Sequence, residues 1–483
     1  MDISSKLLNS AVNAVKNSAY KKYDKNGLEQ LPVGVFDKAH GKAADFYTFG
    51  FGKTVIMPDT PVPDKKTTYF VAGYRNNNPA VGILDNLHAK AIWIDDNSGR
   101  GGVVFVSVDC VGLFGVDVED IRQRLEHFSV VTGCRSINIC STHTHAGIDT
   151  MGMWGPIPKT GRNKKFMEIV KNGVVSAVES AYKNRTKGQI YLGYAKADKG
   201  SQSAPRPPHV VSDAITRLRF VPDDGSPETY MINFASHPES LLGKNSLISA
   251  DFPCYMAQYI HEHKNAESMY FAGAIGGICM NPMDENNIIS TIKTGRRLGE
   301  LVCSIKNEII LKPEINILRQ ELYIPCDNPV FWFVSKVGMI PERIIATNEG
   351  DLKLGMKTEL SYIEFGELKM LLLPGELFPE LAYGGYLSKE ESSINADPEI
   401  NPRPLCEIAE DEKLLVFGLA NGEIGYILTP NDYLLDTKLP FINQPKDKFG
   451  RNHYPETNSL GKKTAYHIAE TFRKMMQTVK NSK

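Results

Sequence analysis

An apolar, β-branched run that stops at two histidines is the feature that constrains this chain most. From residue 136 to residue 147 the sequence reads SINICSTHTHAG, which predicts a buried strand followed by a sharp turn. Residues two apart in a strand point to the same side, so strand geometry held to its end would place His143 and His145 in one cavity. Two neutral imidazoles on one side suit zinc, whereas a hydrogen-bonded histidine pair that only closes the strand would give the same pattern.

The bulk composition is that of an ordinary globular protein. The chain has 483 residues, of which 42% are hydrophobic and 23% are charged, and the formal net charge is -1. This length predicts a large bilobed unit or two to three domains. Acidic and basic residues nearly balance and leave no basic field, so we expect no nucleic-acid partner.

The sequence contains no recognisable targeting or membrane segment. The first residues, MDISSKLL, include no secretory apolar region and no cleavage site. The apolar runs are too short and too interrupted to span a bilayer, so we expect no transmembrane segment and a cytoplasmic location. The eight cysteines are scattered without a CxxC spacing, which favours reduced core residues over a disulfide framework.

Strands and helices are interspersed along the chain, and they predict an α/β fold of layered, mixed β-sheets flanked by helices. Strand-like runs joined by short turns pair residues 87–94 with 102–109, 215–221 with 229–235, and 361–365 with 368–373. Helical periodicity covers residues 164–183, 252–264 and 464–479. We also expect an amphipathic helix over Ser4 to Tyr23, within an N-terminal extension of residues 1–45.

Several other predicted strands end in polar residues. One apolar strand ends at His237, another is followed by Glu376 after a Pro-Gly bend, and a third leads through Asn421 to Tyr426. Together with His143 these strand ends offer two histidines, a glutamate and a tyrosine. Such a set could surround a zinc ion and leave room for water or substrate, provided that the strand ends converge.

The order of these motifs resembles the catalytic domain of the neutral/alkaline (non-lysosomal) ceramidase family. The similar blocks are Gly73-Tyr74, NLHAKA from residue 86, VFVSVD from 104, THTHAG from 142, NFASHP from 233, SAD from 249, the glycine-rich turn ending at Asn281, LPGE from 373, and residues 421–430 and 454–461. The resemblance implies that residues 46–483 form a ceramidase-like zinc hydrolase domain. In a departure from the family, we expect no C-terminal β-sandwich domain in these residues.

The resemblance implies the residues of a catalytic site. The implied zinc ligands are His143, His237, Glu376 and Tyr426; the implied catalytic residues are His145, Tyr426 and Tyr454; and the implied substrate-binding residues include Gly73 and Arg206. The activity implied is hydrolysis of a linear N-acyl amide by a zinc-activated water. The products of that reaction are a fatty acid and an amino-alcohol base.

The glycine-rich turn departs from the family pattern. Where the family reads GDVSPN, residues 276–281 read GGICMN, so that Cys279 stands in place of the serine. Either Cys279 substitutes as a nucleophile, or a zinc-bound water is the attacking group. The family block NRSP is also missing around Arg206, and these departures leave the substrate itself open.

The remaining candidate residues each have a structural alternative. Trp154, with Met151 and Met153, could wall an acyl-chain site or could simply pack a loop on the core. Asp251 could orient a histidine or could cap the following helix. His145 is placed to move the proton to the leaving amine, while zinc and one phenol could stabilise the oxyanion.

The sequence leaves three function classes in view. The leading hypothesis is a zinc-dependent amide hydrolase of ceramidase type, acting on a small-molecule or lipid-like N-acyl substrate. The alternatives are a zinc esterase or lactonase that uses the same site, and a non-catalytic binding protein of the same fold. The protein could also form a homo-oligomer, because no sequence feature determines the oligomeric state.

Overall fold

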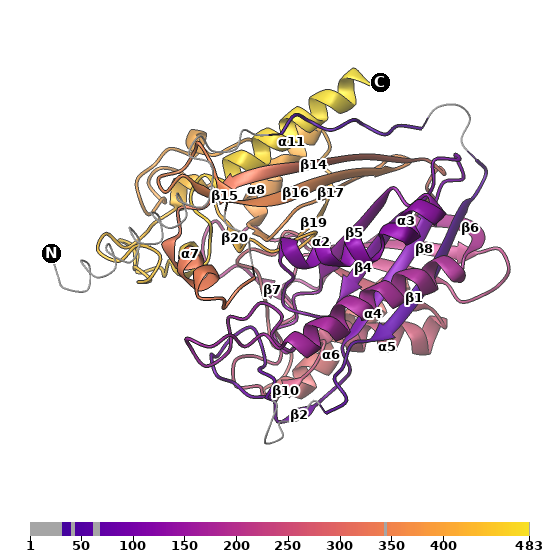
Figure 1. Cartoon of the computed structure of the whole chain (residues 1–483), viewed down its shortest axis with the longest axis horizontal. Helices are drawn as coiled ribbons and strands as arrows, with labels where there is room; N and C mark the ends of the chain where they lie inside the picture. Colours follow the sequence, from indigo (N-terminus) through magenta and orange to yellow (C-terminus); the bar gives the residue numbers. More distant parts are fainter. Residues whose placement is uncertain (1–30, 40–43, 61–67, 342–344, 483) are drawn as a thin grey trace.

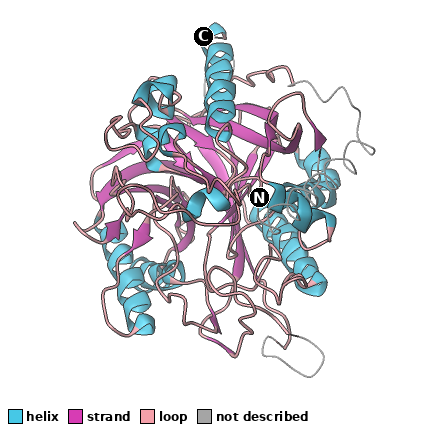
Figure 2. Ribbon diagram, turned by 90° about the vertical axis from the view of Figure 1, so that its left-hand side faces the viewer, coloured by secondary structure: helices cyan, strands magenta, loops and turns pink. Residues whose placement is uncertain are grey.

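The computed structural model describes residues 31–39, 44–60, 68–341 and 345–482. The helix predicted over Ser4 to Tyr23 lies outside the described residues. The large and the small sheet, and the helices that flank them, are drawn in Figure 1, and Figure 2 shows the same molecule turned by 90°.

Within the described ranges, the larger sheet contains nine strands in the order β11-β9-β8-β6-β1-β3-β4-β5, with β13 added beside β6. The strands are β1 (Tyr47–Val55), β3 (His88–Asp95), β4 (Val103–Val108), β5 (Ser136–Ser141), β6 (Thr186–Lys196), β8 (Ala214–Pro222), β9 (Thr229–Phe234), β11 (Glu267–Ala272) and β13 (Glu308–Ile310). Neighbours pair antiparallel through the middle, whereas β4/β5 and β9/β11 at the two edges pair parallel. The sheet is therefore mixed, as predicted.

A second sheet of five described strands packs against the first. It consists of β14 (Ile315–Pro325), β15 (Ile345–Ala346), β16 (Leu354–Phe365), β17 (Leu368–Leu372) and β19 (Leu415–Phe417). The predicted hairpin through Gly366 and Glu367 joins β16 to β17. Three two-stranded pairs complete the strands: β2 (Gly82–Ile83) with β10 (Leu247–Ile248), β7 (Gln202–Ser203) with β12 (Cys279–Met280), and β18 (Glu376–Leu377) with β20 (Tyr426–Ile427).

Aromatic side chains fill the space between the two sheets. Phe105 and Phe271 from the larger sheet contact Phe365 and Phe417 from the smaller one, and the ring centroids of Phe271 and Phe417 lie 5.3 Å apart. Alternation along each strand sends the next residue to the opposite face. Each sheet therefore has a second apolar face, which helices must cover.

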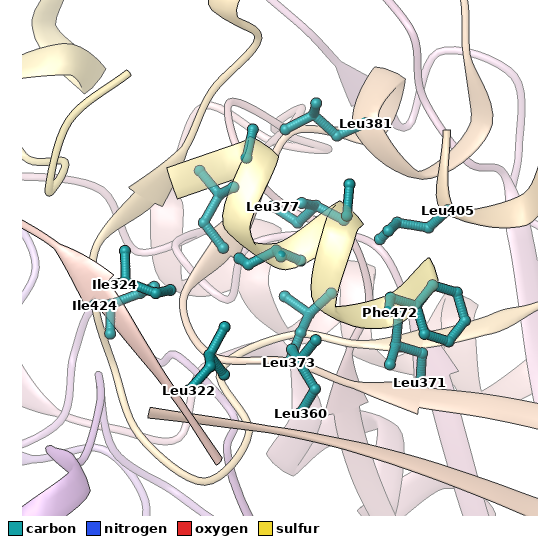
Figure 3. Close-up of a cluster of buried hydrophobic side chains, with 14 of the residues drawn as sticks. Leu322, Ile324, Leu360, Leu371, Leu373, Leu377, Leu381, Leu405, Ile424 and Phe472 are labelled. Carbon is teal, nitrogen blue, oxygen red and sulfur yellow. The ribbon is translucent and has the colours of Figure 1, made fainter. Parts of the chain in front are cut away.

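The helices cover these outer faces and give a four-layer αββα architecture (Figure 1). On the larger sheet lie α2 (Gly115–Arg124), α4 (Lys164–Lys183), α5 (Phe252–Lys264) and α6 (Asn287–Ser304), with α3 (Glu126–Thr132) following α2. On the smaller sheet lie α8 (Pro379–Tyr383), α9 (Leu405–Ala409) and α11 (Thr464–Asn481). Figure 3 shows Phe472 of α11 among Leu360, Leu371 and Leu405. The predicted fold class is confirmed.

The larger sheet curls until its two edges meet. Strand β11 at one edge comes into contact with β4 and β5 at the other. Lys90 of β3 and Ser107 of β4 donate hydrogen bonds to the backbone carbonyls of Ser268 and Tyr270 on β11, at 3.0 and 2.7 Å. The carboxyl ends of β5, β9 and β11 are thereby brought to one place, which adjacency within the sheet alone would not achieve.

The segment after β19 is hydrogen-bonded to the two edge strands of the larger sheet, β5 and β11. Asn421 exchanges hydrogen bonds with Ile139 of β5, through its backbone N–H at 2.7 Å and its side-chain oxygen at 2.8 Å. The backbone N–H of Gly418 donates to Ala272 at the end of β11. The smaller sheet is thus tied to both converging edges of the larger one.

Candidate metal centre and active-site cavity

His143 stands where the chain leaves β5. The strand ends at Ser141, and His143 adopts a φ of +67°, a left-handed conformation that a side chain other than glycine rarely takes. Its backbone N–H donates to the carbonyl of Cys110 at 2.9 Å, which holds the turn. The prediction that strand alternation orients both histidines is therefore wrong. A turn brings the rings of His143 and His145 together instead, with centroids 4.7 Å apart.

Backbone carbonyls set the tautomers of two histidines. The Nδ1–H of His143 donates to Val111, and that of His237 donates to Ile278, each at 2.6 Å. With Nδ1 bonded to a carbonyl in each ring, Nε2 is the nitrogen that faces the site. The Nε2 of His143 is buried and has no hydrogen-bond partner in the described chain. A buried imidazole nitrogen without a hydrogen-bond partner could serve as a metal ligand.

Both Nε2 atoms converge on one carboxylate. Glu376 lies with Oε2 2.9 Å from Nε2 of His237 and with Oε1 3.5 Å from Nε2 of His143. Strand β18 pairs in parallel with β20 and sets Glu376 directly beside Tyr426, whose hydroxyl interacts with the carboxylate. The structure therefore brings together the four residues that the sequence analysis grouped as zinc ligands.

His145 is the third imidazole of the cluster. Its ring nitrogens are buried and unpartnered within the described chain, and Tyr74 packs edge-on against the ring at 5.2 Å. Ligand nitrogens of His143, His145 and His237 all lie within 4.8 Å of one another. This set of donors fits a metal ion, because it gathers three imidazoles beside one carboxylate in the buried interior.

Burial and the neighbouring charges shift the ionisation of the cluster. Burial, followed by the other two imidazoles, holds the pKa of His145 well below its usual range, so the ring is neutral at neutral pH. Burial also opposes a charge on His237, but the hydrogen bond and the charge of Glu376 outweigh it and raise the pKa of His237 to about 9. Burial and then Glu376 raise the pKa of Tyr426, which keeps its phenol protonated.

A cavity of about 470 Å³ opens beside the histidines. The predicted site residues that line it are Gly73, His145, Arg206, Cys279, Tyr426 and Tyr454. Gly73 has a φ of +104°, and a Cβ there would stand 2.5 Å from the side chain of His145. Only glycine lets the backbone approach the imidazole this closely.

Three carboxylates at the site escaped the sequence analysis. Glu239 lines the cavity, accepts a hydrogen bond from the Tyr74 hydroxyl at 2.6 Å and lies 3.8 Å from Nδ1 of His145. Glu423 is buried near Glu376, and burial raises its pKa well above the usual range. Glu380, on α8, also lines the cavity. Each follows a predicted ligand or strand end by two to six residues, and extending the strand-end search that far would have found them.

Cys279 is a poor nucleophile in this environment. Burial, followed by the charge of Glu239, raises the pKa of the Cys279 thiol to about 12. A nucleophilic cysteine needs a thiolate at working pH and a nearby positive charge. Of the two interpretations of the altered turn, the structure favours an attacking water.

Arg206 lines the cavity, but two carboxylates already occupy its guanidinium. Nη2 lies 2.7 Å from Oδ2 of Asp432, and Nη1 lies 2.8 Å from Oε1 of Glu456. Asp432 and Glu456 are themselves buried. The hydrogen bonds of Nε and Nη2 to Asp432 hold the guanidinium in the wall, whereas Nη1 lies close to Glu456 without an aligned hydrogen bond.

Trp154 and Asp251 have structural roles in a loop and at a helix start, in place of the substrate and histidine contacts considered for them. Trp154 is not among the residues that line the cavity, and its loop is held by Asp149, which accepts the Trp154 N–H at 2.9 Å. Asp251 caps α5 at Phe252 and accepts from the Ser240 side chain, whereas the histidine tautomers are set by carbonyls. By holding the loop at Ser240, Asp251 supports the nearby Glu239.

None of the described helices has the length and apolar character needed to cross a membrane. All eight cysteines lie in the described residues and are free.

Comparison with known proteins connects this site to one family. The family profile described as "Neutral/alkaline non-lysosomal ceramidase, N-terminal" matches residues 64–284. Neutral ceramidase 1 of Arabidopsis thaliana is 26% identical over 218 residues, which span 41% of this chain and 28% of that protein. The neutral ceramidase of Drosophila pseudoobscura pseudoobscura is 24% identical over 263 residues, 51% of this chain and 36% of that protein. The matched region thus spans only about a third of these relatives.

Solved structures extend the similarity in fold. A ceramidase structure described as complexed with C2 superposes with a TM-score of 0.69 at 16% identity, covering 90% of this chain and 76% of that one. The neutral ceramidase of Pseudomonas aeruginosa gives a TM-score of 0.67 at 15% identity, covering 91% and 75%. Residues 64–284 are thus similar to the N-terminal domain of the neutral/alkaline non-lysosomal ceramidase family, and the likeness in fold to solved ceramidases extends over most of the chain.

Proposed function

We propose that this protein is a zinc-dependent hydrolase of linear N-acyl amides, with a ceramide-like substrate. The observation that carries the proposal is the convergence of two Nε2 atoms, from His143 and His237, on the buried carboxylate of Glu376. The family relationship supports amide hydrolysis as the reaction. A cytoplasmic location is part of the proposal, and the free cysteines support it.

The residues that would hold zinc are His143, His237, Glu376 and Tyr426. When bound, zinc would lower the pKa of a water toward ~7 and polarise the amide carbonyl. The chain contributes ligands whose tautomers are fixed by Val111 and Ile278, so their lone pairs need no rearrangement. Such preorganisation is what distinguishes a binding site from a chance cluster of histidines.

The cavity supplies the groups for the remaining chemistry. His145 is neutral and its ring nitrogens are unpartnered, so it can take a proton from water and pass it to the leaving amine. Tyr426 keeps its phenolic proton and can donate a hydrogen bond to the developing oxyanion. Tyr454 lies near it, with ring centroids 6.3 Å apart, and is the second candidate donor.

Metal analysis coupled to a substrate panel tests the proposal. We expect close to one equivalent of zinc in the wild-type protein, and loss of that zinc in His143→Ala. His261→Ala, which changes an exposed histidine on α5, serves as the control and should retain the metal. Zinc content that survives His143→Ala unchanged would refute the assignment of the ligands.

The substrate panel pairs N-acyl amides with the matching esters and lactones, with and without chelator. We expect chelator-sensitive amide turnover. Esters or lactones turned over in its place would identify the same centre as an esterase or lactonase. A metal-loaded protein that turns over none of them would support a binding protein of this fold.

A further inference from the structure

One part of the cavity wall is formed by Glu380 and its neighbours. The charged groups that act on Glu380 are Arg206 and Asp432. This part of the wall comes from the loop around Arg206 and His209 and from the start of α8. We call this region the Glu380 end.

Glu380 is a buried carboxyl group without a partner. It is 4% exposed and faces the cavity, and among the described residues its carboxyl group has no hydrogen-bond donor beyond its own backbone N–H. The nearby Tyr386 hydroxyl donates elsewhere, to the carbonyl of Pro402 at 2.7 Å. His209 is exposed, and its Nδ1 faces the carbonyl of Ala204 at 2.5 Å. A buried carboxylate that lacks a donor is costly unless a ligand supplies one.

The charges behind this wall do not compensate Glu380. Arg206 is paired with Asp432 and Glu456, and Arg451 is paired with Asp447 and Asp432. His453 lies between two of these carboxylates, with Nδ1 2.6 Å from Glu456 and Nε2 3.4 Å from Asp447. Even with His453 protonated, this group holds three cations against four carboxylates, and Glu380 is the one left unpaired.

We propose that the Glu380 end of the cavity binds a primary ammonium group of the substrate, with the Glu380 carboxylate as its counter-ion. An anionic substituent at this position would meet an excess of negative charge, and a purely apolar one would leave the carboxylate desolvated. The substrates expected are N-acyl compounds that carry a free amine apart from the amide. The inference rests on the proposed function, because it specifies the substrate class for the same cavity.

Burial supports the assignment in a separate way. It raises the pKa of Glu380 to about 7, and the charge of Arg206 offsets burial only in part. A carboxyl group in that state gains its full charge when a cation binds beside it, as expected for a counter-ion.

Paired substrates test the preference. The series consists of N-acetyl diaminoalkanes of increasing chain length, each matched with the N-acetyl alkylamine whose terminal carbon carries methyl in place of ammonium. We expect one chain length to be preferred by at least about tenfold in kcat/KM over its neutral partner, because a buried charge pair forms only with the ammonium. Equal kcat/KM across all pairs would overturn the proposal.

Glu380→Gln tests the residue. It keeps the shape of the side chain and removes a buried unpaired charge, so the variant should fold. The ammonium-to-neutral ratio should fall to near one in this variant, and it should persist in Glu399→Gln, which changes an exposed carboxylate. A ratio that survives Glu380→Gln would overturn the assignment even if the preference itself is real.

Direct binding separates this inference from the proposed function. In calorimetric titrations we expect butylammonium to bind the wild-type protein at least about tenfold more tightly than butanol, and Glu380→Gln to abolish the difference. If this holds while no N-acyl compound is hydrolysed, the ammonium site stands and the hydrolase proposal fails. If amides are hydrolysed but butylammonium and butanol bind equally, the ammonium site fails alone.

Discussion

The two ends of the cavity handle buried polar groups in opposite ways. At the histidine end, Nε2 of His143 and both ring nitrogens of His145 are buried without hydrogen-bond partners in the described chain, and they lie close to one another. At the Glu380 end, Arg206 forms ion pairs with Asp432 and Glu456, and the carboxylate of Glu380 has no such pair among the described residues. Under the proposed function, a metal ion would complete the first arrangement and a cation on the substrate the second. Polar groups without partners that cluster beside a cavity therefore suggest where a ligand could bind.

The largest effect is expected at the histidine end. Glu376→Gln keeps the side-chain volume but removes the charge on which two imidazoles converge. We expect loss of the bound metal and a fall in kcat/KM of at least about a thousandfold, or roughly 4 kcal/mol of transition-state stabilisation. Metal content and steady-state kinetics measure this. Glu390→Gln, on an exposed carboxylate, is the control and should behave as wild type.

A large loss of folding stability is expected when the ion pairs of Arg206 at the Glu380 end are broken. Arg206→Met removes the guanidinium and leaves Asp432 and Glu456 buried without their cation. Breaking a buried ion pair from one side costs about 3–5 kcal/mol, which denaturant unfolding would detect. Arg403→Met, at an exposed arginine, should change the unfolding free energy by no more than a few tenths of a kcal/mol. An unchanged midpoint in Arg206→Met would show that the cluster is not structural.

Glu380→Gln should stabilise the protein, and only above acidic pH. The unfolded carboxyl ionises near 4.5, whereas the folded carboxyl keeps its proton until about pH 7. Folding stability therefore falls as the pH rises from 4.5 to 7, and the loss persists at higher pH. Removing the carboxyl should recover up to about 3 kcal/mol at alkaline pH and almost nothing below pH 4.5. Melting curves across this pH range measure it, and a pH-independent gain would mean that the effect is not ionisation.

The smallest effect concerns the shape of the cavity beside His145. Gly73→Ala adds a Cβ that would stand 2.5 Å from the imidazole, at a φ of +104°. Strain of this kind costs about 1–3 kcal/mol, and displacement of His145 should lower kcat. Gly225→Ala is a matched control, because Gly225 has a φ of +76° and nothing within 4 Å. If both variants lose equal stability and neither loses kcat, the approach of Gly73 to His145 has no functional role.

Local pattern was a good guide to the elements of the fold. Helix α4 covers the predicted residues 164–183, and α5 the predicted 252–264, because each has an apolar face at helical spacing and a side-chain cap at Asn163 or Asp251. Local pattern is less decisive after residue 327, because an aromatic triplet suits a strand as well as a helix. In the structure Phe331, Trp332 and Phe333 lie on α7 (Pro329–Lys336), which Asn328 caps.

The sequence by itself determined the strands, the flanking helices and the polar residues at the strand ends. These follow from periodicity and from short-range chemistry, which act within a few residues. It did not reveal that β11 meets β5, because curling of the sheet depends on contacts such as that between Lys90 and Ser268.

Tertiary structure alone decided which polar groups are satisfied. Arg206 and Glu380 are both charged residues in loops or short helices, and nothing local marks one as paired and the other as free. The partners of Arg206 are Asp432 and Glu456, which lie more than two hundred residues farther along the chain. Whether a buried charge is compensated depends on groups that folding brings together from distant segments, and so the ligand-binding ends of the cavity emerge only in three dimensions.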